Sequence, residues 1–229
     1  WIRRFEQTLT TVDIVRLDHF RGFAAYWAIP AGDDTAVNGE WETGPGAAFF
    51  EAIRAALGEL PIIAEDLGHI TEDVLELRER FALPGMNVLQ FAFATDAGNP
   101  YLPHNVVHNS VIYTGTHDND TTVGWYASRE EEELAAYQTY VGPTTEPVHW
   151  ALMRLAYQSV SDLAIVPLQD VLGLGTEARM NTPGKFGNNW TWRFEEGQFT
   201  AELEARLRTL CLTYGRTEPE EKQERPAWM

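Results

Sequence analysis

The chain has 229 residues, of which 44% are hydrophobic and 22% charged, and its formal net charge is −17. This composition is typical of a globular protein; it excludes disorder and collagen-like repeats, and no apolar run approaches the roughly 18 residues that span a bilayer. The acidic balance would repel nucleic acid phosphates, and the single cysteine, Cys211, allows neither an internal disulfide nor a cysteine-based zinc site, so we expect a cytoplasmic protein that binds neither nucleic acid nor membrane.

Five short apolar or β-branched runs, each ending in polar residues, predict buried strands. In chain order they span residues 11–18, 60–66, 86–95, 110–118 and 163–170. Helical patterns lie between most of them and cover residues 47–59, 72–81 after a capping Thr71, 131–140 after a candidate capping box of Ser128 and Glu131, 146–160, and 200–214.

This alternation predicts βαβ units and a parallel sheet, either doubly wound or closed into a barrel. Both architectures place functional groups at the C-terminal ends of strands. No glycine-rich nucleotide-binding pattern follows a strand. Residues 215–229 are predicted to form a charged tail, and because the chain begins at Trp1 without a methionine, we expect a truncated N-terminus.

The first candidate site lies at the end of the first predicted strand. Arg16 and Asp18 are two residues apart, so on a strand their side chains point to the same face. An arginine keeps a neighbouring carboxylate ionised, and an ionised carboxylate held in place is a usable nucleophile. An ordinary ion pair facing solvent would explain the same two residues equally well.

The second predicted strand runs directly into Glu65 and Asp66, and Gly68 follows where the chain must turn. A carboxyl that emerges from an apolar strand beside other carboxylates is expected to have a raised pKa, which suits a general acid. Glu65 is the better candidate for that role. The alternative is that both acids simply begin a solvated loop.

Polar residues follow the fourth predicted strand, from Thr114 to Thr121. His117, Asp118 and Asp120 offer ligands that suit several divalent metals, but the spacing of a calcium loop is absent. We therefore rank a metal site below a catalytic one and predict no metal ligand. A plain polar loop would explain the composition of this segment, but not its coincidence with the other two motifs.

Three predicted strands thus each deliver an acid at the same end. Two carboxyl groups about 5 to 5.5 Å apart are what a retaining glycosidase needs, because one attacks the anomeric carbon while the other protonates the leaving oxygen. A third carboxylate could stabilise the positive charge that develops on the sugar ring.

The same segments resemble the catalytic motifs of amylomaltases, the 4-α-glucanotransferases of glycoside hydrolase family 77. The motifs are residues 15–22, 64–68 and 115–121, in matching order and spacing. Supporting stretches are residues 41–46, 167–170, 178–184 and 189–193, and the similarity extends to about residue 214.

The resemblance implies that residues 1–214 are strands four to eight of a (β/α)8 barrel of the α-amylase type, whose earlier strands would precede Trp1. Five strands leave two unpaired edges, so we expect residues 1–229 alone to be a poor enzyme. Asp18 would be the nucleophile, Glu65 the acid/base and Asp118 the stabiliser of the transition state. The substrate would be an α-1,4-glucan, and the chemistry requires no cofactor.

Further residues are candidates for substrate contact. By the same resemblance Arg16 would position Asp18 and His117 would hydrogen-bond sugar hydroxyls. Arg179 and Asn181 resemble family residues near the sugar, although a structural role is an equal alternative.

The aromatic residues divide into two groups. We expect burial of Tyr26, Trp27 and Trp150 in the core. Trp41, and either Trp190 or Trp192, lie in loops rich in glycine or asparagine and are better candidates for stacking on glucan. Two alternatives remain open: an α-amylase-type hydrolase or branching enzyme, and a non-catalytic glucan-binding module.

Overall fold

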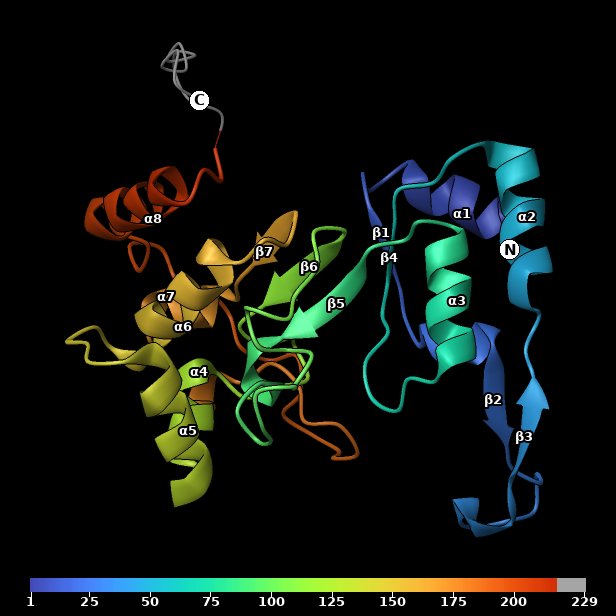
Figure 1. The fold of residues 1–229 in the computed structure, drawn as a ribbon, viewed down its shortest axis with the longest axis horizontal. Coiled ribbons are helices and arrows are strands. Elements are labelled where there is room, and N and C mark those ends of the chain that lie inside the picture. The colour runs from blue at the N-terminus through green and yellow to red at the C-terminus, as the bar shows by residue number, and fades with distance from the viewer. Residues whose placement is uncertain (218–229) are drawn as a thin grey trace. The chain divides into compact units, whose positions relative to one another are not determined.

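The computed structural model describes residues 1–217, so most of the predicted charged tail lies outside the described residues. The helices are α1 (Ile2–Leu9), α2 (Gly46–Leu57), α3 (Glu72–Arg80), α4 (Thr122–Ala127), α5 (Glu131–Val141), α6 (Val148–Gln158), α7 (Leu168–Leu172) and α8 (Ala201–Thr213). The strands are β1 (Val15–Leu17), β2 (Ala25–Ala28), β3 (Glu40–Thr43), β4 (Ile62–Ala64), β5 (Gly85–Val88), β6 (Ser110–Tyr113) and β7 (Leu163–Ile165). Four short 3-10 helices, η1 (Phe20–Phe23), η2 (Ala36–Asn38), η3 (Leu89–Phe91) and η4 (Thr176–Ala178), complete the described elements (Figure 1).

The chain divides into two compact units. The first contains Trp1–Asn87 and His108–Val111, and the second contains Val88–Val107 and the chain from Ile112 onward. A three-stranded sheet has the order β5-β6-β7, and the division between the units falls within β5 and β6. Each unit is described below by itself.

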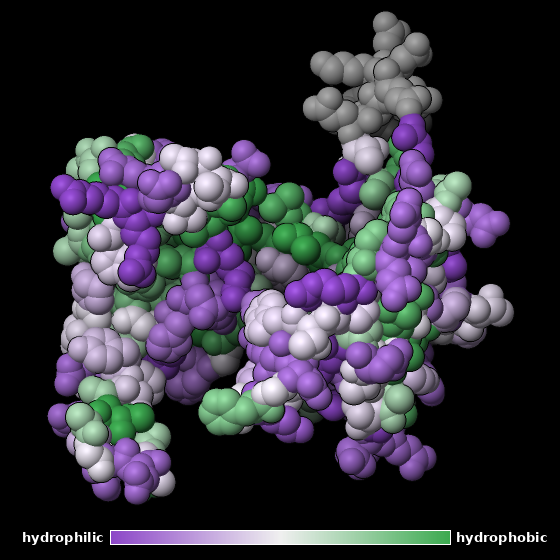
Figure 2. Space-filling model, turned by 180° about the vertical axis from the view of Figure 1, so that it is seen from behind, coloured by the Kyte–Doolittle hydropathy of each residue, from purple (hydrophilic) through white to green (hydrophobic). Residues whose placement is uncertain are grey.

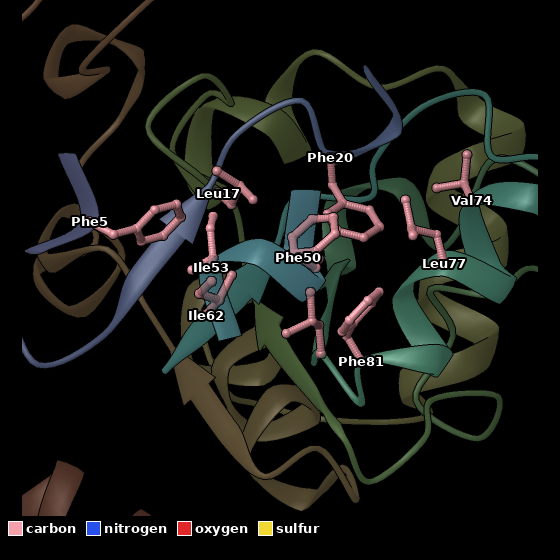
Figure 3. Close-up of a cluster of buried hydrophobic side chains, with 11 residues drawn as sticks. Phe5, Leu17, Phe20, Phe50, Ile53, Ile62, Val74, Leu77 and Phe81 are labelled. Atoms are coloured by element: carbon pink, nitrogen blue, oxygen red, sulfur yellow. The ribbon is translucent and has the colours of Figure 1, made fainter. Parts of the chain in front are cut away.

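In the first unit, β1 and β4 form a parallel pair in which Leu17 lies opposite Ala64. Every residue of β4 is buried, as expected for a strand covered on both faces. Figure 3 shows the apolar cluster beside these strands, to which α2 contributes Phe50 and Ile53 and α3 contributes Val74 and Leu77. This core fixes the ends of the two strands.

An antiparallel hairpin of β2 and β3 also belongs to the first unit, with Trp27 opposite Trp41. The expected burial of Tyr26 and Trp27 is wrong, since they are 39% and 40% exposed. The physical reason is that β2 pairs only with the exposed strand β3 among the described residues, so the core covers neither side chain. Figure 2, which views the molecule from behind, shows apolar residues among polar ones at the end of this hairpin, at the lower left.

The second unit is built around α6, which buries six of its residues, Trp150 among them as expected. One apolar cluster joins α6 to the segments before β6 and to α4 and α5. Another joins α6 to α7 and α8. The guanidinium of Arg216, at the start of the predicted tail, donates hydrogen bonds to the carbonyl oxygens of Tyr157, Ser159 and Ser161.

All five predicted strands are present but shorter than expected. The apolar residues after β5 form the 3-10 helix η3, and the end of the fifth predicted strand begins α7. The predicted burial of the fifth strand is wrong, because Leu163 and Ile165 of β7 are exposed. The last helix begins near Thr200 as expected, and the Thr200 side chain caps α8 by accepting a hydrogen bond from the Leu203 N–H. The capping box is wrong: the Ser128 hydroxyl donates to the Trp125 carbonyl at the end of α4, and Glu130 precedes α5. Thr71 likewise makes no cap hydrogen bond; its hydroxyl accepts one from Arg21.

Within residues 1–217, none of the helices combines the length and the apolar character that crossing a bilayer requires.

Candidate active site

The parallel pairing of β1 and β4 brings Asp18 and Glu65 to the same end of the first unit's strands. Leu17 and Ala64 are in register, so the residues that follow them, Asp18 and Glu65, leave the two strands at the same level. The backbone confirms this, because the Glu65 N–H donates to the Leu17 carbonyl at 3.0 Å and the Phe20 N–H donates to the Glu65 carbonyl at 3.0 Å. The first two motifs therefore lie side by side.

Arg16 reaches along β1 to the Asp18 carboxylate. Its Nη2 lies 2.7 Å from Asp18 Oδ1, and the side chain of Asp18 is 73% exposed while that of Arg16 is 29% exposed. A further contact joins Arg16 Nη1 to the sulfur of Met86 at 3.8 Å. The guanidinium is thus anchored on its inner side and holds a carboxylate that remains open to an incoming group.

Glu65 is bound by backbone donors. Its Oε2 accepts a hydrogen bond from the His19 N–H at 2.7 Å, and its Oε1 accepts one from the Leu67 N–H at 3.0 Å. Burial raises the pKa of Glu65, the negative charge of Asp18 adds to the rise, and the two N–H groups and Arg16 oppose it. The net direction is upward, which confirms the sequence prediction and keeps the proton on this carboxyl to higher pH.

His19 supplies its N–H through an unusual backbone conformation. Its φ of 49° and ψ of 51° lie in the left-handed region, which non-glycine residues rarely adopt outside strained or functional positions. Gly22 gives the imidazole its space, because a Cβ at Gly22 would lie 2.7 Å from His19 Nδ1. The sequence places His19 beside the nucleophile motif but gives no sign of this backbone role.

Asp66 has a different function from its neighbour. It is buried, its Oδ1 accepts from the Met86 N–H at 2.7 Å, and its Oδ2 pairs with Arg78 of α3 at 2.5 Å. Both oxygens are therefore occupied by partners within the fold. Asp66 ties β4 to β5 and α3 through a buried ion pair, whereas Glu65 has only backbone N–H partners and is partly exposed, which makes Glu65 the candidate for chemistry.

Trp41 lies on strand β3, so its predicted position in a loop is wrong, because residues 40–43 pair with β2; it belongs to the same unit as the paired carboxyl groups. Its ring is 54% exposed and rests on the guanidinium of Arg21, 4.3 Å from the ring centroid. Trp27 meets it edge-on at 5.4 Å. Arg21 also donates to the His69 carbonyl at 3.1 Å. This cation–π contact fixes the orientation of an exposed indole.

In the second unit, Asp118 is held by residues from a distant loop. Its Oδ1 accepts from the Asn181 side-chain amide at 2.6 Å, and its backbone carbonyl accepts from Arg179 Nη2 at 2.6 Å. Arg179 also donates from Nε to the Asn181 carbonyl at 2.8 Å. The structure thus brings together Asp118, Arg179 and Asn181, which the sequence separates by more than 60 residues.

His117 completes this group. Its Nε2 lies 3.4 Å from Asp118 Oδ2, and its ring packs on Trp190 with 5.1 Å between centroids. The Asn181 N–H donates to the His117 carbonyl at 3.1 Å. Of the two candidate tryptophans, Trp190 is exposed and Trp192 is partly covered. The arrangement offers an imidazole edge, a carboxylate and an indole on one surface, which suits hydroxyl-bearing rings.

Among residues 1–217, no group of three or more His, Cys, Asp or Glu side chains is placed to hold a metal ion. At the third motif the carboxylates instead have separate partners, because Asp120 accepts from the Thr176 hydroxyl at 2.8 Å while Asp118 accepts from Asn181.

The chain is similar to one family of known proteins. The 4-alpha-glucanotransferase family, glycoside hydrolase family 77, matches residues 1–200. The chain belongs to this family.

Two relatives illustrate the similarity. The 4-alpha-glucanotransferase of Synechocystis is 53% identical over 219 residues, which cover 94% of this chain and 43% of that protein. That of Thermus thermophilus is 51% identical over 219 residues, covering 92% of this chain and 44% of that protein. The chain therefore spans less than half the length of the family members that it matches.

A solved structure extends the comparison to the fold. The amylomaltase of Streptococcus agalactiae, determined in complex with acarbose, matches with a TM-score of 0.90 and 36% identity over 94% of this chain and 44% of that protein. The chain thus shares its mixed α/β fold with an amylomaltase.

Proposed function

We propose that the chain provides the catalytic residues of a 4-alpha-glucanotransferase acting on α-1,4-glucans. The observation that carries the proposal is the pairing of Asp18 and Glu65 at the ends of adjacent parallel strands, one exposed and held by Arg16, the other half-buried with a raised pKa. A retaining mechanism requires one ionised carboxylate as nucleophile and one protonated carboxyl as general acid. Family membership supports the substrate class.

In the first step, Asp18 Oδ attacks the anomeric carbon while Glu65 donates its proton to the departing glycosidic oxygen. A carboxylate–sugar bond forms and the bond to the leaving glucan breaks. In the second step, Glu65 as carboxylate takes the proton from the 4-hydroxyl of an acceptor glucan, whose oxygen displaces Asp18. Configuration at the anomeric carbon is retained after two inversions, and no cofactor takes part.

The other predicted residues have supporting roles in this proposal. Asp118 stabilises the positive charge of the transition state and is held for that purpose by Asn181 and Arg179. His117 hydrogen-bonds sugar hydroxyls, and Trp41 offers a ring face or edge to glucan.

The strands β1, β4, β5, β6 and β7 would be strands four to eight of a (β/α)8 barrel. Among described residues β1 pairs only with β4, so its other edge is available for a strand from the remainder of the family's sequence. We propose that the cytoplasmic enzyme contains that remainder. A stable, active monomer of residues 1–229 alone would contradict this proposal.

The test uses maltotriose and the chain extended by the remaining family sequence. Transfer produces a ladder of longer glucans, whereas a hydrolase produces mainly glucose and maltose. Glu65→Gln should abolish the ladder and leave glucan binding intact, with Glu59→Gln, at an exposed position of the same unit, as the matched control. Unchanged turnover in Glu65→Gln would reject the acid/base role, whereas glucan binding without any turnover in the wild-type protein would indicate a non-catalytic glucan-binding module. A branching enzyme would be recognised by new α-1,6 linkages.

A further inference from the structure

The segment that carries Asp118 is a loop with both ends fixed to one buried side chain. The loop spans residues 115–121, between β6 and α4. Thr114 precedes it and Thr122 follows it, and both are fully buried. Asp170 of α7, 1% exposed, contacts both. The two ends of the loop therefore meet at a single carboxylate.

Asp170 accepts three hydrogen bonds there. Oδ2 accepts from the Thr114 hydroxyl at 2.6 Å and from the Thr122 hydroxyl at 2.7 Å, and Oδ1 accepts from the Thr122 N–H at 2.7 Å. A buried carboxylate is costly unless its oxygens are hydrogen-bonded. All three donors belong to the ends of the Asp118 loop, so the carboxylate and the loop determine each other's positions.

The residue before Asp170, Gln169, holds the loop that carries Arg179 and Asn181. Gln169 is buried and its Nε2 donates to the Ala178 carbonyl at 3.2 Å, directly before Arg179, which binds the Asp118 carbonyl. Two consecutive residues of α7 thus hold the two loops that meet at Asp118. A short helix fixed by the apolar cluster through Val171 gives them a common base.

We propose that Asp170 is a positioning residue for the reaction: it sets the place of the Asp118 carboxylate by closing the 115–121 loop at its base, and Gln169 does the same for the loop of Arg179 and Asn181. This inference rests on the proposed function, in which Asp118 stabilises the transition state. Neither Asp170 nor Gln169 touches the sugar. The expected kinetic consequence is a lower kcat for transfer with a nearly unchanged KM, because a small displacement of a catalytic group costs about 10- to 100-fold in rate.

The test removes the donors rather than the carboxylate. In the full-length protein, Thr114→Val and Thr122→Val together remove two of the three hydrogen bonds with little change in shape. We expect kcat to fall at least about tenfold, KM for maltotriose to stay within about twofold, and Thr114→Ser with Thr122→Ser to restore most of the rate. Asp170→Asn is a second variant with the same expectation.

A matched control separates positioning from loss of stability. Ile112→Val alters a fully buried residue of β6, the strand that precedes Thr114. Ile112 packs into the apolar cluster that joins α6 to α4 and α5. This substitution should lower the melting temperature without lowering kcat. If kcat in the threonine variants only follows the melting temperature, as calibrated by Ile112→Val, the positioning role is wrong.

A double-mutant cycle with Asp118→Asn, measured with an activated aryl α-glucoside donor, completes the test. In the Asp118→Asn background the threonine changes should cost less than about twofold, because groups that act as a unit are not additive. The same loss in both backgrounds would overturn the inference. If Asp118→Asn itself leaves transfer unchanged, the proposed role of Asp118 fails, which is a distinct result from a failure of Asp170.

Discussion

The two units hold their candidate catalytic acids by different means. In the first unit, Glu65 is bound by two backbone N–H groups, from His19 and Leu67, that come from the turns immediately after β1 and β4. In the second unit, Asp118 is bound by the side-chain amide of Asn181 and by Arg179 at its carbonyl.

This difference follows from the chemistry proposed for each acid. Backbone donors cannot be lost to a side-chain rotation, so they hold Glu65 in one place whether it carries its proton or not. The half-buried site raises its pKa, as a proton donor needs. Asp118 instead depends on a loop, and that loop depends on the buried Asp170. One donor to Glu65, Leu67, is two positions away and the other, His19, is 46 positions away, whereas the contacts at Asp118 and its loop join residues 48 to 63 positions apart.

The largest expected effect comes from replacing each of the neighbouring acids, Glu65 and Asp66, by its amide. Glu65→Gln should lower kcat/KM for transfer by about 10²- to 10⁴-fold, the contribution of a general acid, without lowering the melting temperature. Asp66→Asn should destabilise the protein, because it leaves Arg78 without its buried charged partner. Activity assays with thermal unfolding of both variants measure this.

The size of the effect of Glu65→Gln on stability depends on pH. The pKa of Glu65 is higher in the folded than in the unfolded state. The contribution of Glu65 to the free energy of unfolding is therefore most favourable below the unfolded-state pKa, and it is lost as the pH rises through the folded-state pKa. Glu65→Gln should therefore raise the melting temperature at pH 7 relative to wild type and have little effect at pH 4. A melting temperature that falls at pH 7 would mean that Glu65 has a structural role like that of Asp66.

A smaller effect is expected at His19, on which the local arrangement of the first unit depends. His19→Val places a β-branched residue at a φ of 49° and should destabilise the protein by about 1–3 kcal/mol. His19→Asn is the control, since asparagine tolerates the left-handed region. Chemical unfolding of the two variants decides the point; equal stabilities would show that the backbone conformation is not a constraint.

The smallest effect is a shift in the pH profile. The positive charge of Arg16 lowers the pKa of Glu65, so Arg16→Gln should raise that pKa and move the basic limb of kcat/KM to higher pH, by less than about one unit. The rate at the optimum should fall as well, because Asp18 loses its ion pair. A limb that stays in place or moves to lower pH would assign it to another group.

The sequence predicted those features that depend on neighbouring residues. Apolar runs located five strands, including the three that precede the motifs, and the acids after the apolar strand at Ile62 correctly suggested a raised pKa for Glu65. Pairing of β1 with β4 then made Asp18 and Glu65 neighbours, as the strand ends implied.

Features that depend on distant partners could not be predicted. Asp170 is an ordinary residue after a strand until Thr114 and Thr122, 56 and 48 positions away, are folded against it. The left-handed conformation of His19 could not be predicted, because the residue at this position is not a glycine. Tyr26 and Trp27 lie in an apolar stretch of sequence, which predicted burial, but in the structure they lie on an exposed hairpin outside the core.

The assignment of Asp18 as nucleophile and Glu65 as acid/base is tested most directly by trapping the covalent intermediate. In the full-length Glu65→Gln variant, an activated α-glucosyl fluoride needs no acid to depart, so the sugar should accumulate on the enzyme because its removal lacks a base. Mass spectrometry of the digested protein should find one glucosyl unit on the peptide that contains Asp18. A glucosyl unit on a peptide containing Asp118 or Asp120, or free sugar of inverted configuration with no adduct, would contradict the account.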